Sequence, residues 1–445
     1  MSAYLFKNAK IINEGKIFES DIKVKNGRIE KIAPNITSSH ATIIDCLGKY
    51  IIPGMIDDQV HFREPGLTHK GEIKTESKAA IAGGITSFME MPNVSPPTLD
   101  MKAIDDKLNR AKYKSLANYA FYLGASNDNL EAIKSADPKK IAGVKVFMGA
   151  STGNMLVNDP KTLEDIFQHA PTLIATHCED TPMIEENEKR YRQKYGDDVS
   201  FFHHGDIRSR EACLKSSSLA VSLAKKFGSK LHVLHLTTAD EMVLFDNSIP
   251  LEKKKITAEA CVHHLFFSDK DYQTKGSLIK CNPSIKTIND RDVIRNAVKN
   301  NLIDAIATDH APHTIDEKNN PYFQAPSGLP LVQRALPSLL ELHHQGIFTL
   351  EEIVQKTSHN PAIIYQVKDR GFIREGYYAD LVLIDPDKKE IINQNNSLYK
   401  CQWDPFDGIE LHGCIQMTMV NGELLYLNGK FIYETEGKAL EFNRN

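Results

Sequence analysis

The sequence predicts an α/β fold, a (β/α)8 TIM barrel with a small β domain formed by both termini. Short apolar strands alternate with amphipathic helices from about residue 53 to 368, an order that favours parallel βαβ units. Eight such strands predict a closed barrel. The alternative is a doubly wound open sheet, which is less favoured because no GxGxxG motif follows the first strand of this sequence. The expected strands are 54–61, 85–91, 118–124, 143–148, 172–177, 231–236, 278–282 and 303–308.

The two ends of the chain have the pattern of β-hairpins. Asn26-Gly27 lies between strand-like stretches near the start, and Asn421-Gly422 and Asn428-Gly429 do so near the end. Asn-Gly favours tight hairpin turns because both positions adopt positive φ. Neither end alone offers enough strands for a stable sheet, so we expect them to combine. The predicted domains are a small composite β domain, residues 1–52 plus 369–445, and a metal-dependent catalytic barrel, residues 53–368.

Composition limits the partners and the compartment. The 445 residues carry a formal net charge of −4, which argues against nucleic acid or an anionic membrane and favours a small molecule. No apolar stretch approaches the roughly 18 residues that span a bilayer, and a signal-type apolar core is absent, so we expect a cytoplasmic protein. The seven cysteines are scattered and form no CxxC pair, which predicts reduced, mostly buried thiols.

The stretch from Ile52 to Gly66 places polar residues at the end of the first barrel strand. Side chains two apart in a strand share a face. Regular alternation therefore puts Asp57, Gln59 and His61 on one face, and Asp58, Val60 and Phe62 on the other. Barrel active sites lie at the C-terminal strand ends, so Gln59 and His61 are a candidate ligand pair.

Further metal-ligand types occur at other strand ends. The set is His61, His177, His235 and Asp309, with Lys145 inside strand 143–148. One buried histidine is more often a satisfied core residue than a ligand, but several at one end of a barrel would each be costly to bury without a common partner. This pattern predicts a divalent metal centre. Imidazole with carboxylate suits zinc, one or two ions per chain, with manganese, cobalt or iron as alternatives.

Lys145 is the residue that is hardest to explain without a metal centre. A buried ammonium is unfavourable unless its pKa falls, and nearby divalent cations would repel it. A neutral lysine amine reacts with carbon dioxide to give an anionic N6-carboxylated lysine that can bridge two metals. The alternative is a lysine that reaches solvent or pairs with an acid.

With these residues in place, the sequence resembles the amidohydrolase superfamily, and within it the dihydroorotases, over essentially the whole chain. The superfamily pattern is an HxH pair after strand 1, a carboxylated lysine on strand 4, histidines after strands 5 and 6, and an aspartate after strand 8. The similar positions here are Gln59 with His61, Lys145, His177, His235 and Asp309. The segments that resemble dihydroorotases specifically are 61–66, 91–93 and 308–313, and 376–383 is similar to the C-terminal signature.

The resemblance also implies substrate contacts. Arg63 offers a bidentate fork to a substrate carboxylate, with His61, Asn93 and His313 beside it. Asn282, Ser327 and Gly328 would contact a pyrimidine ring, the alternative being a strand cap and an ordinary turn.

The activity implied by the resemblance is the reversible cyclisation of N-carbamoyl-L-aspartate to (S)-dihydroorotate, a step of de novo pyrimidine (UMP) biosynthesis. In the hydrolytic direction a metal-bound hydroxide would attack the ring amide carbonyl. Asp309 would act as general base and then as general acid. The alternatives are a cyclic amidohydrolase of the hydantoinase or allantoinase type and a non-catalytic dihydroorotase-like subunit. We expect a small anionic substrate as the partner, and a homodimer is left open.

Gln59 departs from the family pattern, because the first histidine of the HxH pair is a glutamine here. A neutral amide oxygen is a poorer zinc ligand than imidazole. We therefore expect one tight metal site on Lys145, His177 and His235, and a weaker second site at His61 and Asp309, with Gln59 as a doubtful ligand.

Overall fold

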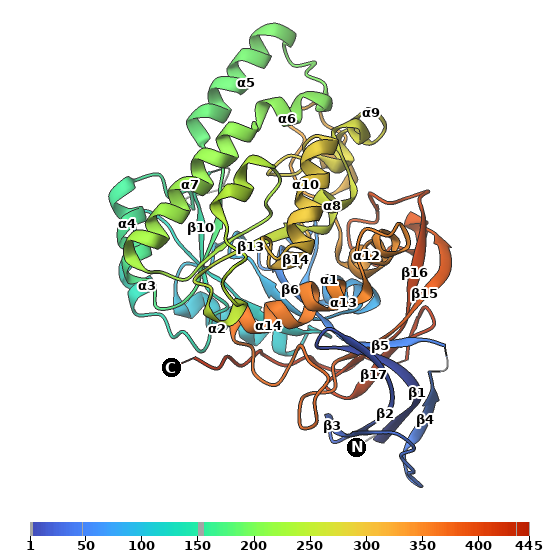
Figure 1. The fold of residues 1–445 in the computed structure, drawn as a ribbon. Helices are drawn as coiled ribbons and strands as arrows, with labels where there is room; N and C mark the ends of the chain where they lie inside the picture. The colour runs from blue at the N-terminus through green and yellow to red at the C-terminus, as the bar shows by residue number, and fades with distance from the viewer. Residues whose placement is uncertain (1–2, 47, 150–154, 433, 445) are drawn as a thin grey trace.

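A computed structural model describes residues 3–444 except 47, 150–154 and 433, and its centre is a parallel β-barrel surrounded by helices (Figure 1). The barrel strands are β6 (Met55–Val60), β7 (Ile85–Glu90), β8 (Asn118–Phe121), β9 (Leu123–Gly124), β10 (Val144–Phe147), β11 (Ile174–His177), β12 (Leu231–Val233), β13 (Ile256–Cys261) and β14 (Ala305–Ala307). These strands are buried along almost their whole length, as expected for parallel strands covered on both faces.

The barrel closes through short contacts between two parallel sheets, β6-β7-β8 and β9 to β14. The chain passes from β8 to β9 across the single residue Tyr122, so these two strands are one pass through the barrel wall. At the other seam, Val60 and His310 form a parallel bridge, and the His61 backbone N–H donates to the His310 carbonyl at 2.7 Å. The predicted (β/α)8 barrel is thus confirmed.

One predicted barrel strand is wrong. Residues 278–282 form no strand; their start lies in a 3₁₀ turn, Gly276–Ile279, and the seventh strand of the barrel is β13, which we did not predict. A short apolar run such as Leu278-Ile279 fits a buried turn as well as a strand. The β13 sequence carries two polar residues, Thr257 and Glu259, and both side chains are buried.

The helices cover the outside of the barrel. Their bounds are α1 (Ile73–Ala82), α2 (Met101–Lys112), α3 (Leu130–Lys134), α4 (Pro160–His169), α5 (Thr181–Tyr195), α6 (His204–Ile207), α7 (Arg210–Phe227), α8 (Val262–Phe266), α9 (Tyr272–Lys275), α10 (Ile288–Lys299), α11 (Ile315–Lys318), α12 (Ala335–His344), α13 (Leu350–Val354) and α14 (Asn360–Tyr365). Side-chain caps begin several of them; Asp180, for example, accepts from the Met183 N–H at the start of α5. Helix α5 projects beyond the rest of the barrel in Figure 1.

The two ends of the chain share a nine-stranded sheet, in which blue and red strands lie side by side in Figure 1. Its strands are β1 (Ala3–Asn13), β2 (Lys16–Lys25), β3 (Arg28–Ala33), β4 (Thr42–Asp45), β5 (Tyr50–Pro53), β15 (Leu381–Ile391), β16 (Glu410–Val420), β17 (Glu423–Leu427) and β18 (Lys430–Phe431). Strand β5 joins the halves, because it pairs with both β1 and β15.

The domain boundaries at 52/53 and 368/369 stay a prediction. The last described residues lie against the barrel: Ala439 forms a bridge with Tyr119, and Arg444 donates to the carbonyls of Ile141 and Tyr365.

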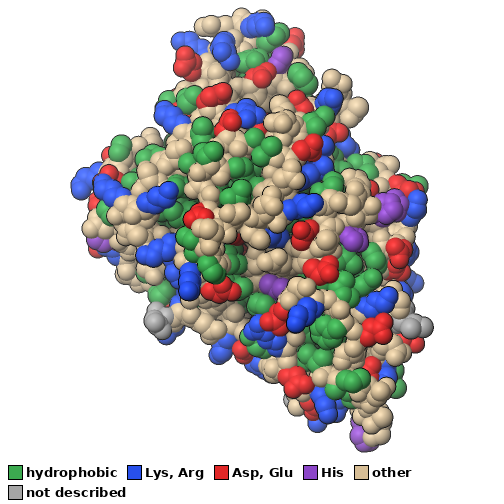
Figure 2. All heavy atoms as spheres, viewed as in Figure 1, with side chains coloured by type: hydrophobic (Ala, Val, Ile, Leu, Met, Phe, Trp, Pro, Cys, Tyr) green, Lys and Arg blue, Asp and Glu red, His purple; other side chains and the backbone are tan. Residues whose placement is uncertain are grey.

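The surface and the thiols agree with the composition. Acidic and basic side chains are interspersed over the face in Figure 2. All seven cysteines are buried free thiols, as predicted. Within the described parts of the chain, no helix combines the length and apolar character needed to cross a membrane.

Candidate active site

A cavity of about 230 Å³ opens at the C-terminal ends of the barrel strands. Twelve of its lining residues are those predicted from the sequence: Gln59, His61, Arg63, Asn93, Lys145, His177, His235, Asn282, Asp309, His313, Ser327 and Gly328. Phe147, Ala311 and Pro326 also line it and were not predicted. The barrel therefore brings together side chains that are up to about 270 residues apart in the sequence.

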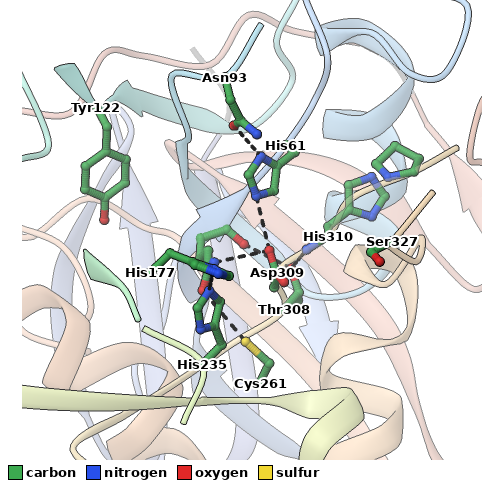
Figure 3. A network of polar contacts seen from close by, with 12 residues as sticks. His61, Asn93, Tyr122, His177, His235, Cys261, Thr308, Asp309, His310 and Ser327 are labelled. Carbon is green, nitrogen blue, oxygen red and sulfur yellow. Dashed lines mark hydrogen bonds and ion pairs between the residues drawn. The ribbon is translucent and has the colours of Figure 1, made fainter. Parts of the chain in front are cut away.

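Asp309 is the centre of one half of this cavity (Figure 3). Its Oδ1 lies 3.1 Å from His61 Nε2 and accepts a hydrogen bond from Gln59 Nε2, also at 3.1 Å. The Gln59 oxygen is directed elsewhere and accepts from the Cys261 thiol at 3.8 Å. Gln59 thus presents a donor, and not a ligand oxygen, to the carboxylate.

The position of the ring proton on His61 leaves the other ring nitrogen free to bind a metal ion beside Asp309. The His61 Nδ1 lies 2.8 Å from the Asn93 Oδ1, which can only accept, so Nδ1 carries the proton. Burial lowers the pKa of His61, which favours the neutral ring and leaves a lone pair on Nε2. This lone pair faces the Asp309 carboxylate, and a cation shared by the two would satisfy both.

His177 and His235 form the other half of the cavity. His177 Nε2 donates to Glu179 Oε2 at 2.8 Å, which leaves its Nδ1 as an acceptor 3.0 Å from His235 Nε2. The same Glu179 oxygen accepts from Arg208 at 2.6 Å, so the carboxylate is held on two sides. Burial lowers the pKa of both histidines, and neutral imidazoles so placed fit a metal ion.

Lys145 is buried in β10 beside both halves, with its Nζ 4.5 Å from the centre of the Phe147 ring. Burial lowers the pKa of its ammonium to about 8, although the charge of Asp309 acts in the opposite direction. The neutral amine is therefore a minor form near neutral pH but far more abundant than for an exposed lysine, and it is the form required for reaction with carbon dioxide.

Arg63 and His313 place a cation and a neutral ring at the cavity wall. Arg63 Nε donates to the Pro312 carbonyl at 3.1 Å, and its Nη2 lies 3.1 Å from His313 Nε2. Lys70 donates to His313 Nδ1 at 3.1 Å, so the His313 proton is on Nε2 and is directed to the Ser327 carbonyl at 3.0 Å. Burial and then the charge of Arg63 lower the pKa of His313 to about 3, which keeps the ring neutral.

The backbone is unusual at these positions. Arg63, His235 and Asp309 have φ values of 72°, 41° and 50°, in the left-handed region that non-glycine residues seldom adopt. Gly328 has φ 141°, and a Cβ there would lie 2.4 Å from the Ala311 carbonyl oxygen. Such conformations concentrate at functional sites, where the surrounding structure enforces them.

Asn282 contributes an open acceptor to the cavity. Its Oδ1 is buried without a hydrogen-bond partner among the described residues. Buried amide oxygens are rarely left unpaired, so this atom is available to a ligand donor.

Several buried polar residues were not found by sequence reasoning. Glu179 is one, although its position two residues after His177 was a usable signal. Two groups of three among the described residues could also hold an ion: Cys261, His263 and His264 are one, and Asp58, His232 and Glu259 are the other. Both imidazole rings of the adjacent pair His263-His264 are buried.

The predicted alternation in the first strand fails at Asp58. Gln59 and His61 share the cavity as expected, but the Asp58 carboxylate lies beside His232 on β12 and Glu259 on β13. Neither strand pairs with β6, so this side chain crosses the barrel interior. The cause is an irregularity in β6, whose register against β7 shifts between Asp57 and Val60.

Comparison with known proteins gives concordant results. A model of the amidohydrolase family matches residues 50–425. The chain is 33% identical to a dihydroorotase of Methanosphaera stadtmanae over 99% of this chain and 100% of that protein. It is 31% identical to a dihydroorotase of Pyrococcus abyssi, with 97% of each chain covered. A dihydroorotase of Bacillus cereus is 32% identical, over 95% of this chain and 98% of that one.

Solved structures show the same architecture. An L-hydantoinase (dihydropyrimidinase) from Arthrobacter aurescens superposes with a TM-score of 0.93 at 26% identity, over 99% of this chain and 100% of that chain. A dihydropyrimidinase from Brevibacillus agri gives a TM-score of 0.89 at 22% identity with both chains fully covered, which supports the fold alone.

Proposed function

Because the chain belongs to the amidohydrolase family, we propose that it is a dihydroorotase, which interconverts N-carbamoyl-L-aspartate and (S)-dihydroorotate. Both compounds carry a carboxylate that takes no part in the reaction. Hydrolysis of the ring amide consumes one water molecule, and cyclisation releases it. This reaction belongs to de novo pyrimidine biosynthesis.

The observation that carries the proposal is the guanidinium of Arg63 in the cavity wall. The hydrogen bond from its Nε to the Pro312 carbonyl orients the guanidinium, so a substrate carboxylate meets a pre-oriented donor. Asn93 uses its Oδ1 to bind His61, which leaves its amide N–H groups for substrate. The Asn282 oxygen and the loop at Ser327 and Gly328 are assigned to the pyrimidine ring.

The metal assignment rests on the lone pairs described above. We assign zinc to the cavity, one or two ions per chain. His177 and His235 would hold it in one half and His61 and Asp309 in the other, and Lys145, once N6-carboxylated, would supply an anionic ligand between them. Such an ion, when bound, polarises the amide carbonyl and lowers the pKa of water. Gln59 is left out as a ligand, because its amide N–H group faces Asp309.

Asp309 is assigned the proton transfers. Burial alone would raise its pKa, but positive charge at the His61 side of the carboxylate holds the pKa below its ordinary value. A metal ion held between Asp309 and His61 would supply that charge and keep the carboxylate ionised near neutral pH. Asp309 can therefore accept a proton from the attacking water and deliver it to the ring nitrogen as the amide bond breaks. The reverse transfers serve cyclisation.

Two rival functions remain distinct from this proposal. The hydantoinase type is represented by the solved structures that share the fold, and such an enzyme would not require a carboxylate anchor. A non-catalytic subunit is disfavoured because the candidate ligands, the acid and the anchor line one cavity.

The test is turnover by the purified, zinc-supplemented protein, followed through the ultraviolet absorbance of the dihydroorotate amide. We expect Arg63→Met to lower kcat/KM for dihydroorotate by about 30-fold or more, since removing one partner of a buried charge pair costs about 2–5 kcal/mol. Turnover of an uncharged hydantoin, if the wild type shows any, should be unchanged. The exposed Arg190→Met is the matched control. Wild-type protein that hydrolyses hydantoin but not dihydroorotate would contradict the proposal.

A further inference from the structure

Below the catalytic cavity, three ionisable side chains meet inside the barrel. Asp58, His232 and Glu259 have no exposed surface. His232 Nε2 lies 3.2 Å from Asp58 Oδ2 and 3.4 Å from Glu259 Oε2. None of these three residues lines the catalytic cavity. The group therefore requires an explanation of its own.

The two His232 contacts are short, but neither meets the full geometry of a hydrogen bond. His232 Nε2, both oxygens of Asp58 and the Oε2 of Glu259 are buried without a hydrogen-bond partner among the described residues. Buried polar atoms seldom lack a hydrogen-bond partner. Each exception is explained by a bound ion, a bound water molecule or a functional role.

The other nitrogen of His232 indicates where its proton is. Nδ1 lies 2.7 Å from Thr257 Oγ1, and that hydroxyl donates to the Leu231 carbonyl at 3.3 Å. A hydroxyl has one proton to donate, so it accepts from His232, and Nδ1 carries the imidazole proton. A neutral His232 then presents the lone pair of Nε2 to two carboxylates, an arrangement that needs a positive charge between them.

We propose that these three side chains bind a divalent transition-metal cation, separate from the metal centre of the catalytic cavity. Ligands about 2.1 Å from a tetrahedral zinc ion lie about 3.4 Å from one another, which matches both observed separations. Two carboxylates and one imidazole suit zinc, with manganese as the next choice. The hydrogen bond from Nδ1 to Thr257 is the support that metal-bound histidines commonly have.

The competing explanation is a proton in place of the cation. The neighbouring carboxylates raise the pKa of His232 to about 9, although burial acts in the opposite direction. An imidazolium would then donate to an oxygen, but neither Nε2 contact meets the combined distance and angle of a hydrogen bond. The geometry favours the cation.

Such an ion would connect the barrel floor to the catalytic site. Its ligands come from β6, β12 and β13, so it joins the two parallel sheets across the interior. The second oxygen of Glu259, Oε1, accepts from the backbone N–H of His235 at 3.1 Å. The cation would thus hold Glu259, and Glu259 supports the strained turn at His235.

The direct test is anomalous diffraction at the zinc absorption edge from crystals of the wild-type protein grown with zinc. We expect a peak about 2.1 Å from His232 Nε2 and within ligand distance of Asp58 and Glu259. Its presence or absence is independent of enzymatic activity. Crystals with a peak at His177 and His235 but none at His232 would overturn the proposal and leave the proposed function intact.

Elemental analysis of variants provides the second readout. After dialysis, Asp58→Asn and His232→Gln should each hold about one zinc fewer per chain than the wild type. Removal of the exposed imidazole in His169→Gln is the matched control and should change nothing. Thr257→Val should weaken zinc retention against a chelator about 10-fold or more. Equal zinc contents in the wild type and both ligand variants would overturn the proposal, and if the variants do not fold, the diffraction result decides.

Discussion

The two halves of the catalytic cavity differ in what holds their side chains. In the His235 half, His177 and His235 face each other, and Glu179 with Arg208 secures His177 from outside the cavity. In the Asp309 half, the carboxylate is shared between His61 and the amide of Gln59.

This difference indicates how one substitution, Gln59 in place of a histidine, would divide the roles within the proposed metal centre. The His235 half has two neutral imidazoles, and Glu179 fixes the orientation of His177, which favours tight metal binding. In the Asp309 half, an ion must displace the Gln59 hydrogen bond before it reaches the same oxygen. A less firmly bound ion also leaves Asp309 free to transfer protons. The comparison therefore assigns metal retention to one half and proton transfer to the other.

Asp309→Asn should give the largest effect. An amide of the same shape cannot accept the proton of the attacking water, so we expect kcat to fall by about 10²–10⁴-fold while zinc in the His235 half is retained. Steady-state kinetics and elemental analysis of the same preparation measure the two quantities. Asp292→Asn on the exposed face of α10 is the matched control. Loss of all zinc along with the activity would show that the halves are not separate.

Gln59→His should make the halves more alike. The substitution supplies an imidazole and removes the amide donor from Asp309 Oδ1. We expect the weaker zinc site to tighten by about 10-fold or more, measured by calorimetric titration of metal-depleted protein.

The control is Gln168→His, which adds a histidine to the exposed side of α4. The wild type should show two unequal sites. Two equally tight zinc ions in the wild type would contradict the asymmetry.

The sequence predicted the cavity well because a barrel gathers its strand ends at one face. His61, His177, His235 and Asp309 each follow or end a barrel strand, so their meeting depends only on strand order. The same rule failed for β13, where Glu259 interrupts the apolar pattern. A carboxylate in the middle of a strand can be recognised as buried only when its partners in the fold are known. For Glu259 these are His232 and Asp58.

Local irregularities in the strands also could not be predicted from the sequence. The alternation of side chains assumes a regular strand, and the register shift in β6 carries Asp58 into the barrel interior instead. Three lining residues of the cavity, Phe147, Ala311 and Pro326, have no chemical signature and were found only from the fold.

Glu179→Gln should produce the smallest effect and provides the sharpest test of the His235 half. The amide oxygen can still accept from His177 Nε2, so the ring keeps its position, but the charge opposite Arg208 is lost. The lowered pKa of this carboxyl, about 2, keeps it charged at any working pH; burial opposes that shift, and Arg208 and His177 outweigh it. We therefore expect zinc affinity in this half to fall by about 10-fold, the lower end for residues that support a metal ligand. Chelator competition measures the affinity, with the exposed Glu186→Gln on α5 as the control.

The Asp309 half should keep its own affinity, because Glu179 contacts neither His61 nor Asp309. An equal loss in both halves would mean that the ions bind as one bridged unit, and the division of roles between the halves would have to be abandoned.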